Sequence, residues 1–113
     1  MDLQASDIGE ARVVRVGAAR LDAAGAIAFK DGMRELAADA PPRVILDLGA
    51  VEFLDSSGLG AVVAVMKELA PERRLELAGL HGAVEKVFRL TRMDKVFKVH
   101  ADLAAATGHI HAS

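Results

Sequence analysis

Cysteine, tryptophan and tyrosine are all absent from this chain of 113 residues. Without cysteine, the chain has no disulfide, no thiolate metal ligand and no cysteine nucleophile. With only four phenylalanines, it also lacks the aromatic platform on which many proteins stack nucleic-acid bases. Aliphatic side chains must therefore supply most of the hydrophobic core.

An excess of charge of one sign is also missing. The chain has 14 Lys and Arg against 16 Asp and Glu, and its cations are scattered among the acids. Direct binding of nucleic acid usually needs a basic stripe, so we expect no nucleic-acid partner. The N-terminal stretch has neither the basic nor the apolar part of a secretory signal, and no run approaches the roughly 20 apolar residues of a membrane span. We therefore expect a cytoplasmic protein without a membrane span.

The length fits one globular domain, since 52% of the residues are hydrophobic and 27% are charged. We expect a single domain over residues 1–113 with a short flexible tail at about 108–113. The tail holds His109 and His111 at alternating positions, where an extended segment could ligate a metal. No third ligand is apparent, so a frayed terminus explains the tail better, and we expect neither a metal nor a cofactor.

Apolar periodicity predicts alternating strands and helices. We expect strands at 11–16, 44–48, 75–80 and 96–99, and helices at 23–40, from the polar residues 55–58 to Leu69, at 83–90 and at 102–107. Asp22 stands where the first helix would have its N-cap. Such alternation implies an α/β fold with a largely parallel sheet. The aliphatic run at 44–48 is, by itself, typical of a strand covered on both faces.

A short polar insert, Asp55-Ser56-Ser57-Gly58, separates two apolar segments. Asp and Ser at a helix start have an ordinary role as caps of free backbone N–H groups. One capping side chain would be enough, yet two hydroxyls follow each other here. The glycines at 58 and 60 also leave the first helical turn without side chains, so another backbone could approach it closely.

Several acidic residues could lie near this insert in the folded protein. The carboxylates that could gather near it are those of Asp22, Asp47, Glu52 and Asp55. A cluster of this kind would give the helix start a negative environment.

The insert does not match known enzyme motifs. A nucleophile elbow needs Gly two residues before the serine, and Leu54 or Asp55 stands there. A triad could still use His81 or His100, although a histidine in a small domain is usually just solvated. The glycines are not followed by the Lys-Ser or Lys-Thr pair of a phosphate-binding loop. We therefore expect a binding module and not an enzyme.

Phosphorylation of a helix-start serine remains as a functional hypothesis. The helix dipole tolerates a phosphate, while the added charge of about -1.5 to -2 beside carboxylates repels an acidic or apolar partner. Such a modification can switch binding without unfolding the domain.

The stretch VILDLGAVEFLDSSGLGAVV closely resembles the anti-sigma factor antagonists, the bacterial phosphoprotein members of the STAS domain family. Strand, Asp-Ser-Ser-Gly-Leu-Gly and aliphatic helix follow the family pattern without a gap. Leu21-Asp22 resembles the Leu-Asp pair before the family's first helix. Residues 75–90 and 93–99 resemble its late strand, helix and last strand.

The resemblance implies a mixed sheet of four to five strands with helices packed mainly on one side. It implies a partner that is both an anti-sigma factor and a serine kinase, so that binding releases a sigma factor, and a phosphatase that reverses the modification. By position, Ser56 is the phosphorylation site, and Ser57 is the expected helix cap. The resemblance also implies a partner-binding and switch surface that comprises Asp22, Asp55, Ser57, Gly58, Leu59 and Gly60.

One departure from the family pattern lies beside this site. Members usually carry Gly-Glu before the Leu-Asp pair, whereas this chain has Ala19-Arg20. Arg20 reverses the local charge, which would either alter pairing with the kinase or offset phosphoserine repulsion. Some members are instead adaptors in lipid-transport or stress-signalling complexes without a phosphorylation switch, and this is the alternative function.

Overall fold

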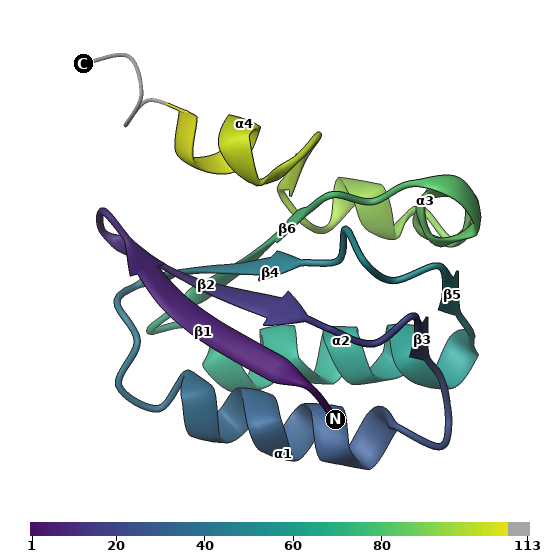
Figure 1. The fold of residues 1–113 in the computed structure, drawn as a ribbon, viewed down its shortest axis with the longest axis horizontal. Coiled ribbons are helices and arrows are strands. Elements are labelled where there is room, and N and C mark those ends of the chain that lie inside the picture. The colour runs from purple at the N-terminus through teal and green to yellow at the C-terminus, as the bar shows by residue number, and fades with distance from the viewer. Residues whose placement is uncertain (109–113) are drawn as a thin grey trace.

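A five-stranded mixed sheet forms the centre of the protein in a computed structural model that describes residues 1–108 (Figure 1). The sheet order is β1-β2-β4-β6-β7, with β1 antiparallel to β2 and the remaining neighbours parallel. These strands are β1 (Leu3–Ile8), β2 (Ala11–Val16), β4 (Arg43–Asp47), β6 (Arg74–Ala78) and β7 (Val99–His100). The predicted tail, with His109 and His111, lies almost wholly outside the described residues.

Among residues 1–108, four helices and a small second sheet complete the fold. The helices are α1 (Ala26–Leu36), α2 (Ser56–Leu69), α3 (Gly82–Leu90) and α4 (Leu103–Thr107), with a short 3-10 turn η1 (Met93–Lys95) before β7. The second sheet has only two strands, β3 (Arg20–Leu21) and β5 (Phe53–Leu54), which pair in parallel. It connects the end of β2 to α1 and the end of β4 to α2.

The two faces of the main sheet are covered unequally. On one face, Val44 and Leu46 join a large core to which α1, α2 and α3 all contribute. On the other face, Ile45 joins a much smaller core that includes Ala106 of α4. Figure 1 shows α1 and α2 below the sheet and the short α4 above it. The prediction of a mixed sheet with helices mainly on one side is confirmed, and full covering of both faces is not observed.

A buried ionic cluster holds α4 on the less covered face. Glu76 is 2% exposed and accepts hydrogen bonds from Arg43 Nη2 at 2.9 Å and from His100 Nε2 at 2.8 Å. Arg43 Nη2 also donates to the carbonyl of Ala106 in α4 at 2.7 Å. Burial alone would raise the pKa of Glu76, but the hydrogen bonds from Arg43 and His100, with the nearby positive charge, outweigh burial and hold it below the ordinary value. The cluster is therefore an ion pair inside the fold.

Several elements differ from the sequence predictions, besides the short strands β3 and β5, which were not predicted. The edge strand β1 was not predicted, because its residues are mostly exposed and polar; Gly9, with φ of 61°, forms the turn that pairs it with β2. The last strand is displaced from 96–99 to β7, because residues 93–95 form η1 and Phe97 packs edge-to-face on Phe88 with ring centroids 6.1 Å apart.

The first helix also begins later than predicted, at Ala26. Asp22 is not its N-cap: the Asp22 carbonyl accepts a hydrogen bond from Gly25 N at 3.1 Å, which makes residues 22–25 a turn. No side chain caps α1. The Asp22 carboxylate pairs instead with Arg20.

Candidate functional site

The polar insert lies where the small sheet meets the start of α2. Arg20 pairs with Phe53 and Leu21 with Leu54 in the β3–β5 ladder. The backbone N–H groups of Glu52 and Phe53 both donate to the carbonyl of Ala19, at 2.7 and 3.1 Å. This pairing brings residues 20–22 beside residues 53–58, which are far away in the sequence.

Asp55 joins these two segments. Its Oδ1 accepts a hydrogen bond from Gly58 N at 2.8 Å, and its Oδ2 accepts one from Ala23 N at 3.3 Å. Asp55 is therefore the N-cap of α2, and the prediction that Ser57 caps the helix is wrong. One carboxylate has two oxygens, so Asp55 can cap α2 and hold the neighbouring turn at the same time, which one hydroxyl cannot do.

Ser56 and Ser57 occupy the first turn of α2, and both residues are exposed. Within residues 1–108, neither hydroxyl takes part in a hydrogen bond, and the backbone N–H groups of both serines lack an acceptor. Such free N–H groups and the positive end of the helix dipole form a favourable environment for negative charge. Ser56 therefore has no structural role in the described fold that its neighbours do not perform.

The two glycines of the insert have opposite surroundings. A Cβ on Gly58 would overlap the carbonyl oxygen of Leu21 and lie 2.9 Å from the carbonyl carbon. The backbone that approaches Gly58 is thus that of β3 in the same chain, and Gly58 is buried. A Cβ on Gly60 would meet nothing within 4 Å, and Gly60 is exposed. Of the two, only Gly60 leaves its backbone accessible to another molecule, beside the half-buried Leu59.

The predicted gathering of carboxylates is only partly observed. Asp22 and Asp55 lie close together, since Asp55 bonds the residue after Asp22. Asp47 does not join them: its Oδ1 accepts from Gly49 N at 2.9 Å, and its Oδ2 lies 3.8 Å from Arg15 Nε. Its position in β4 places it on the same face as Ile45, because side chains alternate along a strand.

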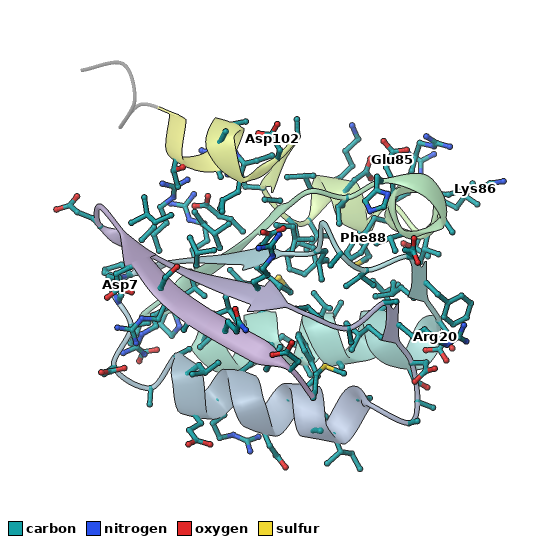
Figure 2. All side chains as sticks on the ribbon, viewed as in Figure 1. Asp7, Arg20, Glu85, Lys86, Phe88 and Asp102 are labelled. Atoms are coloured by element: carbon teal, nitrogen blue, oxygen red, sulfur yellow. The ribbon has the colours of Figure 1, made fainter. Side chains whose placement is uncertain are left out.

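Arg20 adds a positive charge to this site. Its Nε lies 3.3 Å from Asp22 Oδ2, and its guanidinium carbon lies 4.1 Å from the ring centroid of Phe53. The Arg20 side chain is 62% exposed and that of Asp22 is 25% exposed. Figure 2 shows Arg20 at the end of the molecule where Figure 1 places β3, β5 and the start of α2.

No catalytic triad or metal site forms among the described residues. His81 Nε2 lies 2.9 Å from the carbonyl oxygen of Gly49, and His100 is bound to Glu76 on the other face of the sheet. Neither histidine contacts Ser56 in the described part of the chain. Residues 1–108 also contain no group of three or more His, Asp or Glu side chains that could hold a metal ion.

Removing the Asp55 side chain should destabilise the protein by about 1–2 kcal/mol, the usual cost of losing an N-cap, with a further loss from the bond to Ala23. Asp55→Asn should lose less, since Asn caps a helix about as well as Asp, but its NH2 group cannot accept the hydrogen bond from Ala23 N, so that part of the loss remains. Chemical denaturation of Asp55→Ala and Asp55→Asn measures the stability loss of each variant. Equal stability of the two variants would show that the cap does not support the fold.

None of the helices in the described residues is both long and apolar enough to cross a membrane.

Comparison with known proteins gives three relatives of interest. The anti-sigma-F factor antagonist RsfB of Mycobacterium tuberculosis is 28% identical over 83 residues, which cover 74% of this chain and 68% of the relative. The crystal structure of an anti-sigma factor antagonist from Mycobacterium paratuberculosis is 29% identical, with a TM-score of 0.84 over 97% of this chain and 93% of that chain. The Bacillus cell fate determinant SpoIIAA in its phosphorylated form is 24% identical, with a TM-score of 0.69 over 96% and 99% of the two chains.

The family match covers the main sheet, the small sheet and the polar insert together. The sequence profile of the STAS domain matches residues 2–106. The fold agrees with that match, because the solved relatives superpose over nearly the whole chain. This protein therefore belongs to the STAS domain family.

Proposed function

We propose that this protein is an anti-sigma factor antagonist, which binds an anti-sigma factor kinase in the cytoplasm and so releases a sigma factor, and that phosphorylation of Ser56 ends the binding. The observation that carries the proposal is an exposed serine without a structural role at the start of α2, next to an aspartate that already caps the helix. The names of the two mycobacterial relatives support the antagonist function. They also favour it over the adaptor function.

The proposed binding surface is the edge of the site whose residues are exposed or half-buried. It comprises Asp22, Ser57, Leu59 and Gly60 around Ser56. Leu59 offers apolar area, Gly60 offers bare backbone, and Asp22 offers a charge. Asp55 and the buried Gly58 act differently, because their contacts with Ala23 and Leu21 fix the position of that edge.

Phosphorylation would change the charge of this surface more than its shape. In the transfer, Ser56 Oγ forms a bond to the terminal phosphorus of ATP held by the kinase, the bond from that phosphorus to ADP breaks, and the hydroxyl proton passes to a base of the kinase. The phosphate adds about -1.5 to -2 charges beside Asp22 and Asp55. The free N–H groups of α2 stabilise the phosphate, so the fold persists while the kinase is repelled. A phosphatase would restore binding by hydrolysis.

The test combines phosphate mapping with binding. Each variant is incubated with ATP and the kinase-type anti-sigma factors of the source organism, and mass spectrometry locates the phosphate. The parent and Ser57→Ala should each be modified at Ser56, and Ser56→Ala should not be modified. Ser56→Asp should bind the same anti-sigma factor at least about tenfold more weakly by calorimetry, with a Tm within about 2 °C of the parent.

Several outcomes would contradict the proposal. Phosphate on Ser57, or full binding by Ser56→Asp, would remove Ser56 as the switch. Unfolding of Ser56→Asp would show that the serine is structural. Stable association with a transporter subunit, without modification of Ser56, would favour the adaptor function.

A further inference from the structure

Arg20 is held in position by stacking. It stands opposite Phe53 in the β3–β5 ladder, and its guanidinium carbon lies 4.1 Å from the centroid of the partly exposed Phe53 ring. A planar guanidinium over an aromatic face gains from cation–π attraction and loses fewer conformations when it binds something else. The guanidinium therefore lies over β5, close to where α2 begins.

In the described part of the chain, Arg20 uses only one of its N–H donors in its ion pair with Asp22, so most of the hydrogen-bonding capacity of Arg20 is unused. Within residues 1–108, the only ion pair of Arg20 is the one from Nε to Asp22 Oδ2 at 3.3 Å. An exposed pair of this kind contributes little, typically less than about 1 kcal/mol. A guanidinium has five N–H donors in a rigid fork that suits a phosphate. Arg20 can therefore exchange this partner at small cost.

The backbone of β3 lies directly against the start of α2. The carbonyl of Leu21, the residue after Arg20, contacts Gly58 and accepts a hydrogen bond from Asp55 N at 3.4 Å. Ser56 lies between Asp55 and Gly58 in the sequence, so its hydroxyl is on the turn that abuts β3. Arg20, the exposed residue before Leu21, is therefore a cation on the strand that packs against the turn carrying Ser56.

We propose that Arg20 is the intramolecular partner of phosphoserine 56, and that phosphorylation moves its guanidinium from the Asp22 carboxylate to the phosphate. This inference rests on the proposed modification of Ser56 and describes the site once the phosphate is present. A phosphate carries more negative charge than a carboxylate and can accept two parallel N–H bonds from one arginine. The free N–H groups of α2 hold the same phosphate from the other side.

The exchange has a consequence for the binding surface. While Ser56 is unmodified, Arg20 offsets the charge of Asp22. After the exchange, Asp22 is no longer paired, so one modification changes the surface at two positions. Arg20 would thus stabilise the phosphorylated state. It would also increase the difference in surface charge between the phosphorylated and the unmodified states.

The test installs phosphoserine directly at position 56 by encoding it during synthesis, so that no kinase is needed. The second pKa of the phosphate is measured by 31P NMR between about pH 4.5 and 8, around its usual value near 6. The parent should show a pKa about 0.5 unit lower than Arg20→Gln, because the guanidinium favours the dianion. Arg20→Lys should fall between them, since it keeps the charge but not the fork. Far-UV circular dichroism checks that each variant is folded.

Arg15→Gln is the matched control. Arg15 is 64% exposed and lies near Asp47 on the other face of the sheet, so this variant removes the same charge far from Ser56. Its phosphate pKa should agree with that of the parent within about 0.1 unit, since surface charges at a distance are screened. In the parent, the NMR signal of Arg20 Nε–H should also move on phosphorylation.

The outcomes separate this inference from the proposed function. Equal phosphate pKa values in the parent and Arg20→Gln, or an equal shift in Arg15→Gln, would overturn the pairing with Arg20. If phosphorylation still abolished binding of the anti-sigma factor, the proposed switch would stand without it. An Arg20-dependent pKa together with undiminished binding would support the pairing and overturn the switch.

Discussion

Gly58→Ala should destabilise the protein by about 3 kcal/mol or more, at the upper end of what overpacking costs. The added methyl group would overlap the carbonyl oxygen of Leu21 and lie 3.2 Å from its side-chain Cγ. Leu21 cannot move aside easily, because its side chain is fully buried and its carbonyl accepts the hydrogen bond from Asp55. Either β3 or the start of α2 must shift.

Gly60→Ala is the matched control, two residues further along the same helix. A Cβ there meets nothing within 4 Å, so the variant should gain up to about 1 kcal/mol from the better helix propensity of alanine. Urea denaturation of both variants gives the comparison. Similar stability changes for the two would contradict the contact between Gly58 and Leu21. Binding of the anti-sigma factor by the stable Gly60→Ala variant would also show how closely a partner approaches Gly60.

Glu76→Gln should cost about 2–3 kcal/mol at pH 7, somewhat below the usual loss from breaking a buried ion pair, because Arg43 remains partly solvated. The variant leaves the Arg43 guanidinium without its carboxylate under α4. Glu68→Gln is the control, since Glu68 pairs with Arg34 at a similar distance of 2.8 Å but both side chains are well exposed. That change should cost less than about 1 kcal/mol.

The loss of folding stability in Glu76→Gln should also depend on pH. Because the pKa of Glu76 is lower in the folded protein than its ordinary value of 4.5, ionised Glu76 stabilises the fold fully above that value. This contribution disappears as the pH falls through the lowered pKa. Denaturation at pH 7, 5, 4 and 3.5 should therefore show the gap between the parent and Glu76→Gln narrowing only below about pH 4.5. A constant gap would mean that the ionisation of Glu76 does not stabilise the fold.

The sequence predicted the elements whose patterns are local. The aliphatic run of β4 and the periodicity of α2 are properties of neighbouring residues, and both elements lie within a residue or so of their predicted bounds. β3 and β5 have only two residues each, too few for any period to be visible. Their pairing depends on the packing of α1 and α2 against the sheet, which a single sequence does not reveal.

The details of the site depended on contacts between distant residues. In the folded protein, Asp55 and not Ser57 caps α2. Asp55 bonds Ala23 as well as Gly58, and Ala23 is 32 positions away in the sequence. The ionic cluster under α4 was missed for a similar reason, since its members come from β4, β6 and β7. One signal was available: Glu76 interrupts the aliphatic run Leu75 to Leu80, where a charge needs a partner if it is buried.

The small sheet also decides how the site can move. β3 and β5 pair through only two residues each and have no ladder to the five-stranded sheet among residues 1–108. Segments with few hydrogen bonds open locally at a much lower free energy than global unfolding requires. The exposed end of the small sheet, Arg20 with Glu52 and Phe53, is therefore a unit that can open locally while the main sheet and the buried Leu21 and Leu54 stay in place. Amide hydrogens in this unit should exchange faster than those of β4, and a phosphate on Ser56 would act on this local equilibrium.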